Sequence, residues 1–146
     1  MKLFLDTNIL IDVLARREGF YDAASNVIQL GITGEVSLST TSMSLATTLF
    51  VTRKTLGYDN ALAALKALEP YIEIASMDAT QCHTALHAPM PDFEDNLQYE
   101  AAQASECDII ITRNKKHFLQ ESIPVMTPIE FLTLFHSSPL STSPTT

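Results

Sequence analysis

The 146-residue chain has only two cysteines, four glycines and no long apolar run. Cys82 and Cys107 do not form a C-x-x-C pair, so we expect both to be packing residues of a reduced, cytoplasmic protein. No segment approaches the roughly 18 apolar residues of a membrane span, and the N-terminal segment, interrupted by Asp6 and Asp12, does not have the pattern of a signal peptide. With so few glycines the chain also has no P-loop, dinucleotide-binding fingerprint or Gly-x-Ser-x-Gly elbow.

Positive charge is scarce as well. Nine Lys and Arg residues stand against 17 Asp and Glu, which gives a net charge of −8 and a pI of about 4.8. This balance offers no general electrostatic attraction for a phosphate backbone, so any nucleic-acid contact must be local. Seven of the nine cations fall into three clusters, which are Arg16 with Arg17, Arg53 with Lys54, and Arg113 with Lys115 and Lys116. These clusters are either local phosphate contacts or solvated helix ends.

Strand and helix patterns alternate along the chain, which is typical of an α/β domain with a parallel sheet and covering helices. The predicted strands are 2–5, 36–39, 71–75, 108–112 and 124–126. The predicted helices are 8–15, 20–31, 42–56, 59–68, 78–87, 93–105 and 128–135. We expect one domain over residues 1–136, followed by a Ser-, Thr- and Pro-rich disordered tail over residues 137–146 that is too polar to join a core.

Oxygen ligands are predicted to meet at the carboxyl edge of this sheet. Asp6 follows the first strand and Asn114 follows the fourth. The helix 93–105 precedes the fourth strand and runs antiparallel to it, so its first turn, with Asp92 and Asp95 on one face, lies at the same edge. One acid in a first turn is often only a helix cap. Carboxylates from separate elements repel one another unless a cation lies among them, and Mg²⁺ or Mn²⁺ suits such oxygen ligands.

Three motifs follow one another along the chain. They are Leu-Asp-Thr-Asn-Ile-Leu at 5–10, Asp-Phe-Glu-Asp at 92–95 and Ile-Ile-Thr-Arg-Asn-Lys-Lys-His-Phe at 110–118. Together they resemble the signatures of PIN domains, metal-dependent nucleases that include the VapC-type toxins of bacterial toxin–antitoxin pairs. The resemblance extends to about Phe135 and implies a three-layer α/β/α sandwich with a central parallel sheet. It also implies a Mg²⁺- or Mn²⁺-dependent ribonuclease, an RNA substrate, an antitoxin partner and a homodimer.

The same resemblance gives each oxygen ligand a role. It implies that Asp6 and Asp95 bind the metal, with Asp92 as a companion ligand or general base and Asn114 orienting water or metal. The phosphate beside the cleaved bond is expected to contact cations of the last motif. These cations are Arg113, Lys115 and Lys116.

Two positions depart from the family pattern. Relatives usually carry a glutamate, or in some subgroups an asparagine, in the middle of the helix 42–56, where this chain has Thr47. A hydroxyl is a poorer metal ligand than a carboxylate, so weaker metal binding and weaker activity are expected. His117 stands where many relatives carry another aspartate. A catalytically weak PIN-like module that binds RNA or a protein is therefore an alternative interpretation.

Two other site interpretations are less favoured. A haloacid-dehalogenase-like phosphatase also has an aspartate at the end of its first strand, but it needs a second aspartate two residues later, where this chain has Asn8. His83 and His87 lie four residues apart on a predicted helix without the glutamate of the zinc-protease motif. We interpret these histidines as partly exposed helix residues.

Overall fold

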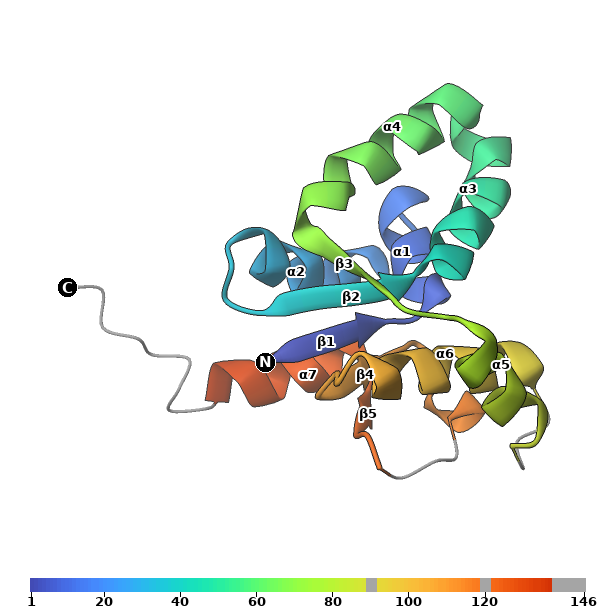
Figure 1. Ribbon diagram of the computed structural model, residues 1–146. Coiled ribbons are helices and arrows are strands. Elements are labelled where there is room, and N and C mark those ends of the chain that lie inside the picture. Colours follow the sequence, from blue (N-terminus) through green and yellow to red (C-terminus); the bar gives the residue numbers. More distant parts are fainter. Residues whose placement is uncertain (89–91, 119–121, 138–146) are drawn as a thin grey trace.

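The computed structural model describes residues 1–88, 92–118 and 122–137 of the chain. Its centre is a five-stranded sheet in the order β3-β2-β1-β4-β5, in which neighbouring strands are parallel (Figure 1). The strands are β1 (Lys2–Leu5), β2 (Ser37–Thr41), β3 (Ile72–Ala75), β4 (Ile109–Ile111) and β5 (Val125–Met126). The prediction of an α/β fold with a central parallel sheet is confirmed.

Helices connect these strands and lie on both sides of the sheet. The α-helices are α1 (Thr7–Leu14), α2 (Tyr21–Ile32), α3 (Ser42–Leu56), α4 (Tyr58–Leu68), α5 (Ala79–Leu86), α6 (Phe93–Ala104) and α7 (Pro128–Ser137). Each boundary lies within two residues of its predicted place. The sequence pattern does not predict two short 3₁₀ turns, η1 (Glu69–Tyr71) and η2 (Lys115–His117).

The two faces of the sheet are covered by different helices. Successive side chains of a strand point to opposite faces, so Leu3 and Leu5 of β1 pack with α1, α2 and α7, while Phe4 packs with α6. The helix α5 packs beside α6, and α3 packs against both α1 and α4 (Figure 1). This is the predicted three-layer arrangement, and its central strands β1 and β4 are buried on both faces.

Local sequence accounts for the ends of α3 and the start of α7. Thr41 Oγ1 accepts the backbone N–H of Ser44 at 3.0 Å, which caps the start of α3. Gly57 ends the same helix with a φ of +82°, a conformation that glycine adopts without steric strain. At the start of α7, Thr127 and Glu130 each accept the backbone N–H of the other.

The C-terminal helix α7 ends at Ser137, next to the predicted boundary between domain and tail. The rest of the predicted tail, residues 138–146, lies outside the described residues. Cys107 is buried in the core beside α6, and Cys82 is half-buried on α5. Among the residues that the structure describes, no helix combines the length and the apolar character needed to cross a membrane.

Candidate functional site

The site lies where the strand order of the sheet changes direction. From β1 the chain moves outward to β2 and β3, and it later returns to place β4 and β5 on the other side of β1. Open α/β sheets bind ligands at the carboxyl ends of the strands at such a switch point. The register pairs Leu5 with Ile111, so the next residues, Asp6 and Thr112, lie side by side at this edge.

Asp6 is a buried carboxylate that is fixed by hydrogen bonds. It is only 6% exposed. Its Oδ1 accepts the backbone N–H of Thr7 at 2.8 Å, and its Oδ2 accepts the hydroxyl of Thr112 at 2.8 Å and the Asn8 amide at 3.4 Å. Burial raises the pKa of Asp6, the bonds from Thr112 and Thr7 lower it, and the negative charge of Asp92 adds to the rise.

The first turn of α6 adds further acids to this edge. Asp92 is exposed and caps the helix, because its Oδ1 accepts the backbone N–H of Asp95 at 3.0 Å. The Asp95 side chain is 13% exposed. Burial, followed by the charges of Asp92 and Asp6, raises the pKa of Asp95 to about 6. Burial and the same two charges also raise the pKa of Glu94. The structure thus brings four acids close enough to influence one another.

The loop after β4 contributes an amide and an imidazole. The backbone N–H of Asn114 donates to Thr112 Oγ1 at 3.1 Å, and the Asn114 side chain is exposed. His117 in η2 places its Nδ1 3.4 Å from Asp95 Oδ2. From the sequence, His117 is only a departure from the family pattern. Its contact with Asp95 is not predicted there. Its place in the last motif was the one available signal.

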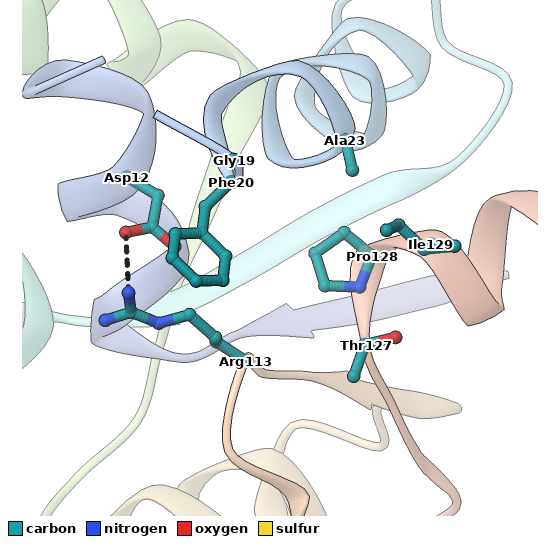
Figure 2. Close-up of a pocket in the computed structure, with 8 residues that line it drawn as sticks. All are labelled: Asp12, Gly19, Phe20, Ala23, Arg113, Thr127, Pro128 and Ile129. Carbon is teal, nitrogen blue, oxygen red and sulfur yellow. Dashed lines mark ion pairs between the residues drawn. The ribbon is translucent and has the colours of Figure 1, made fainter. Parts of the chain in front are cut away.

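Arg113 extends toward α1 and the loop before α2 (Figure 2). Its Nη1 lies 3.6 Å from Asp12 Oδ1, and its guanidinium lies 4.5 Å from the centroid of the Phe20 ring. Asp12 is 1% exposed, and burial raises its pKa while Arg113 and Arg17 lower it. This ion pair borders a pocket of about 180 Å³ lined by Asp12, Gly19, Phe20, Ala23, Arg113, Thr127, Pro128 and Ile129.

The two lysines of the last motif have different surroundings. Lys115 Nζ lies 2.9 Å from Glu130 Oε2 at the start of α7, and this hydrogen bond lowers the pKa of Glu130. Lys116 is exposed. Of the three cations that were predicted to contact phosphate, Arg113 and Lys115 therefore have acidic partners within the protein.

The donor set at the sheet edge suits a hydrated cation. In the described parts of the chain, no three His, Cys, Asp or Glu side chains are grouped so that they could hold a metal. Mg²⁺, however, usually keeps several waters and takes one or two protein carboxylates, and Asp6 and Asp95 provide two. A cation would also offset both the burial and the repulsion that raise the pKa of Asp95. The residues present fit such an ion in chemistry and in charge.

The helix α3 supplies no carboxylate to the site. Thr47 is half-buried on this helix, and none of its 15 residues is acidic. Its fully buried side chains are Ser44, Thr48 and Thr52. The Thr48 and Thr52 hydroxyls donate to backbone carbonyls one turn earlier, each at 2.7 Å. The helix therefore contributes hydroxyl groups, and its three buried ones bond within the protein.

Comparison with known proteins assigns the fold. Residues 2–116 match the sequence profile of the PIN domain. The chain is similar to VapBC2 from Rickettsia felis bound to a promoter DNA fragment, with a TM-score of 0.66 and 17% identity over 87% of this chain and 98% of that chain. It is similar to a toxin–antitoxin complex from Klebsiella pneumoniae, with a TM-score of 0.59 and 25% identity over 86% of this chain and 97% of that chain.

A third similar structure is VapC20 from Mycobacterium tuberculosis, a toxin that cleaves the sarcin–ricin loop. The TM-score is 0.63, with 13% identity over 79% of this chain and 92% of that chain. The structural neighbours are thus VapC toxins of VapBC systems. No curated protein sequence matches the chain.

The raised pKa of Asp95 predicts that Asp95→Asn stabilises the metal-free protein by an amount that depends on pH. The pKa of Asp95 is about 6 in the folded protein, above the ordinary 3.8. Below pH 3.8 the carboxyl is protonated in both the folded and the unfolded chain and does not disfavour folding. As the pH rises through 6 the buried carboxyl ionises, and the folded protein loses stability relative to the unfolded chain. We expect the variant to exceed the wild type in unfolding free energy by about 1 to 2 kcal/mol at pH 8 and to match it near pH 4.

Urea unfolding in EDTA at both pH values measures this difference. Glu18→Gln, which changes an exposed acid in the loop before α2, is the control and should show no such pH-dependent gain. An equal advantage of Asp95→Asn at pH 4 and pH 8 would contradict the raised pKa assigned to Asp95.

The pair of Asp12 and Arg113 predicts a structural cost for Arg113→Met. The substitution leaves a buried carboxylate without its nearest cation, and we expect a loss of about 1 to 3 kcal/mol in unfolding free energy at pH 7.5. Adding Asp12→Leu should recover most of the loss, because both charges are then absent. Lys116→Met, at an exposed cation, should change the value by less than about 0.5 kcal/mol. Unchanged stability of Arg113→Met would show that the ion pair contributes nothing.

Proposed function

The chain belongs to the PIN-domain family, and on that premise we propose that it is a metal-dependent ribonuclease that hydrolyses RNA phosphodiester bonds. The observation that carries the proposal is the meeting of Asp6, at the end of β1, with Asp95, in the first turn of α6. Asp6 and Asp95 come from separate elements, and the charge of Asp6 adds to the raised pKa of Asp95, so a cation bound beside them would favour their ionised forms.

The roles of the acids follow from their surroundings. Asp6 and Asp95 would hold a Mg²⁺ or Mn²⁺ ion, and such an ion, when bound, lowers the pKa of a coordinated water and neutralises charge on the phosphate oxygens. Asp92 is exposed at the start of α6, where it can accept the proton of the attacking water or bind the metal through water. Asn114 can orient water or substrate by its exposed amide.

Substrate phosphates would be held by a small number of cations. A net charge of −8 excludes broad electrostatic capture of RNA, so the contacts are local, and we place them in the last motif because its loop follows β4 beside Asp6. We assign the main phosphate contact to Lys116, which is exposed, and a secondary one to Lys115, which must share its charge with Glu130. Arg113 is engaged by Asp12 and Phe20 and has a smaller part in binding.

The biological setting that we propose is a toxin–antitoxin pair. The support comes from neighbours whose solved forms are VapBC or toxin–antitoxin complexes, and from one neighbour that is a toxin cleaving the sarcin–ricin loop. The proposed partners are an antitoxin protein that inhibits the nuclease, a second copy of this chain in a homodimer, and an RNA substrate.

Because this chain has Thr47 where relatives usually carry an acid, we also propose that it binds the metal with reduced affinity. A site with two metal-binding carboxylates and no acid from α3 holds an ion less tightly than a site with three. This observation favours a second candidate, a PIN domain that binds RNA or a protein and cleaves weakly or not at all. The phosphatase interpretation has no support, since the chain belongs to another family.

Cleavage of a mixed RNA pool by purified protein in Mg²⁺, Mn²⁺ or EDTA tests the proposal. We expect cleavage with either metal, none in EDTA, and a loss of more than about 100-fold in Asp6→Asn, since changes that act only indirectly on a metal already cost about 10- to 100-fold. Asp59→Asn changes an exposed acid on α4 and should retain full activity. Wild-type protein that cleaves no faster than Asp6→Asn in any metal would favour the binding module.

A further inference from the structure

A cluster of buried polar side chains joins α1, α3 and α6 next to the two carboxylates. This cluster, named the Gln98 network, consists of Thr7, Thr41, Ser44 and Gln98. Its members are at most 8% exposed. They come from the start of α1, the end of β2, the start of α3 and the middle of α6. The network therefore connects segments that are far apart in the sequence.

Gln98 is at the centre of this network. Its Nε2 donates to Thr7 Oγ1 at 3.0 Å and to Ser44 Oγ. Its Oε1 accepts the hydroxyl of Thr41 at 2.9 Å. Thr41 Oγ1 also accepts the backbone N–H of Ser44 and lies 3.1 Å from Ser44 Oγ. These partners give both ends of the amide a hydrogen bond.

A buried amide needs a physical reason at this position. Gln98 is 1% exposed, and burial of an amide costs free energy unless hydrogen bonds compensate for the lost water. A leucine or methionine of similar size would pack in the same layer without that requirement. The gain from the amide is directional, because its bonds hold α6 at one position relative to α1 and α3.

The network acts close to both carboxylates. Thr7 directly follows Asp6, and Gln98 lies three residues after Asp95, on the same face of α6. We propose that Gln98 is a positioning residue whose bond to Thr7 sets the separation of Asp6 and Asp95 and so prepares them for a shared metal ion. This inference rests on the proposed function.

The proposed role answers a requirement of the site. Asp6 and Asp95 repel each other when no cation is present, and this repulsion favours movement of the first turn of α6 away from β1. A hydrogen bond one turn further along α6 opposes that movement. A site that is held in its binding geometry loses less free energy to ordering when the ion binds. Because α3 gives no carboxylate, the placement of these two acids matters more.

Three variants separate positioning from general stability. Gln98→Met removes the amide at nearly constant volume, and Thr7→Val removes its partner while keeping the backbone N–H that bonds to Asp6. Ser44→Ala removes another partner of the same amide but leaves the bond between Gln98 and Thr7. Manganese affinity is measured by electron paramagnetic resonance of free Mn²⁺, and stability by urea unfolding in EDTA.

The expected result is a split between the variants. Gln98→Met and Thr7→Val should each raise the Kd for Mn²⁺ about 10-fold, as changes to residues that support metal ligands commonly do. Their combination should be no worse than either alone, since both remove the same bond. Ser44→Ala should change the Kd less than about twofold. Its unfolding free energy should nevertheless fall by about as much as that of Gln98→Met and Thr7→Val. Unchanged affinity in Gln98→Met, or equal loss in Ser44→Ala, would overturn the proposal.

Metal-free crystal structures of the same proteins keep the test independent of nuclease function. The separation of the Asp6 and Asp95 Cα atoms should increase in Gln98→Met and Thr7→Val and not in Ser44→Ala. If wild-type protein binds no Mn²⁺, the proposed metal-dependent function fails, and this separation alone decides the role of Gln98. An unchanged separation in all three variants would overturn the positioning role.

Discussion

The parallel pairing of β1 with β2 on one side and β4 on the other is the constraint on which the site depends. Parallel strands end at the same edge, so the residue after β1 and the residue after β4 become neighbours although they are 106 positions apart. Thr112 donates its hydroxyl to Asp6 as a direct result. The helix α6 precedes β4 and must begin at that edge, which brings Asp92 and Asp95 to the same place.

Electrostatic repulsion among the acids at this edge is a consequence of this topology. Burial and neighbouring acids both disfavour the ionised form of Asp95, and the protein supplies limited compensation through hydrogen bonds to Asp6 and the imidazole of His117. Two cations of the nearest loop are directed to other acids, Arg113 to Asp12 and Lys115 to Glu130. The site thus retains a negative charge that a divalent ion can neutralise, because Arg113 and Lys115 are paired with acids outside it.

Much of this arrangement can be predicted from sequence, because it follows from local pattern and topology. The β-branched run from Ile109 to Ile111 predicts a buried strand, and the positions of Asp6 and Asp95 follow once the sheet is parallel. The contacts between Arg113 and Asp12, between His117 and Asp95, and within the Gln98 network are not predictable in the same way. Each joins elements that are distant in sequence, and each depends on how two helices or loops pack, which no periodicity encodes. The short turn η2, which carries His117, has no distinct sequence signal either.

The central claim is that Asp6 and Asp95 together hold a divalent cation at the carboxyl edge of the sheet. Anomalous diffraction from crystals soaked in Mn²⁺ tests it most directly, because the scattering locates the ion without reference to activity. The predicted result is an anomalous peak within bonding distance of a carboxylate oxygen of each residue, absent from crystals of Asp6→Asn. Manganese bound only elsewhere on the protein, or a peak that persists unchanged in Asp6→Asn, would contradict it.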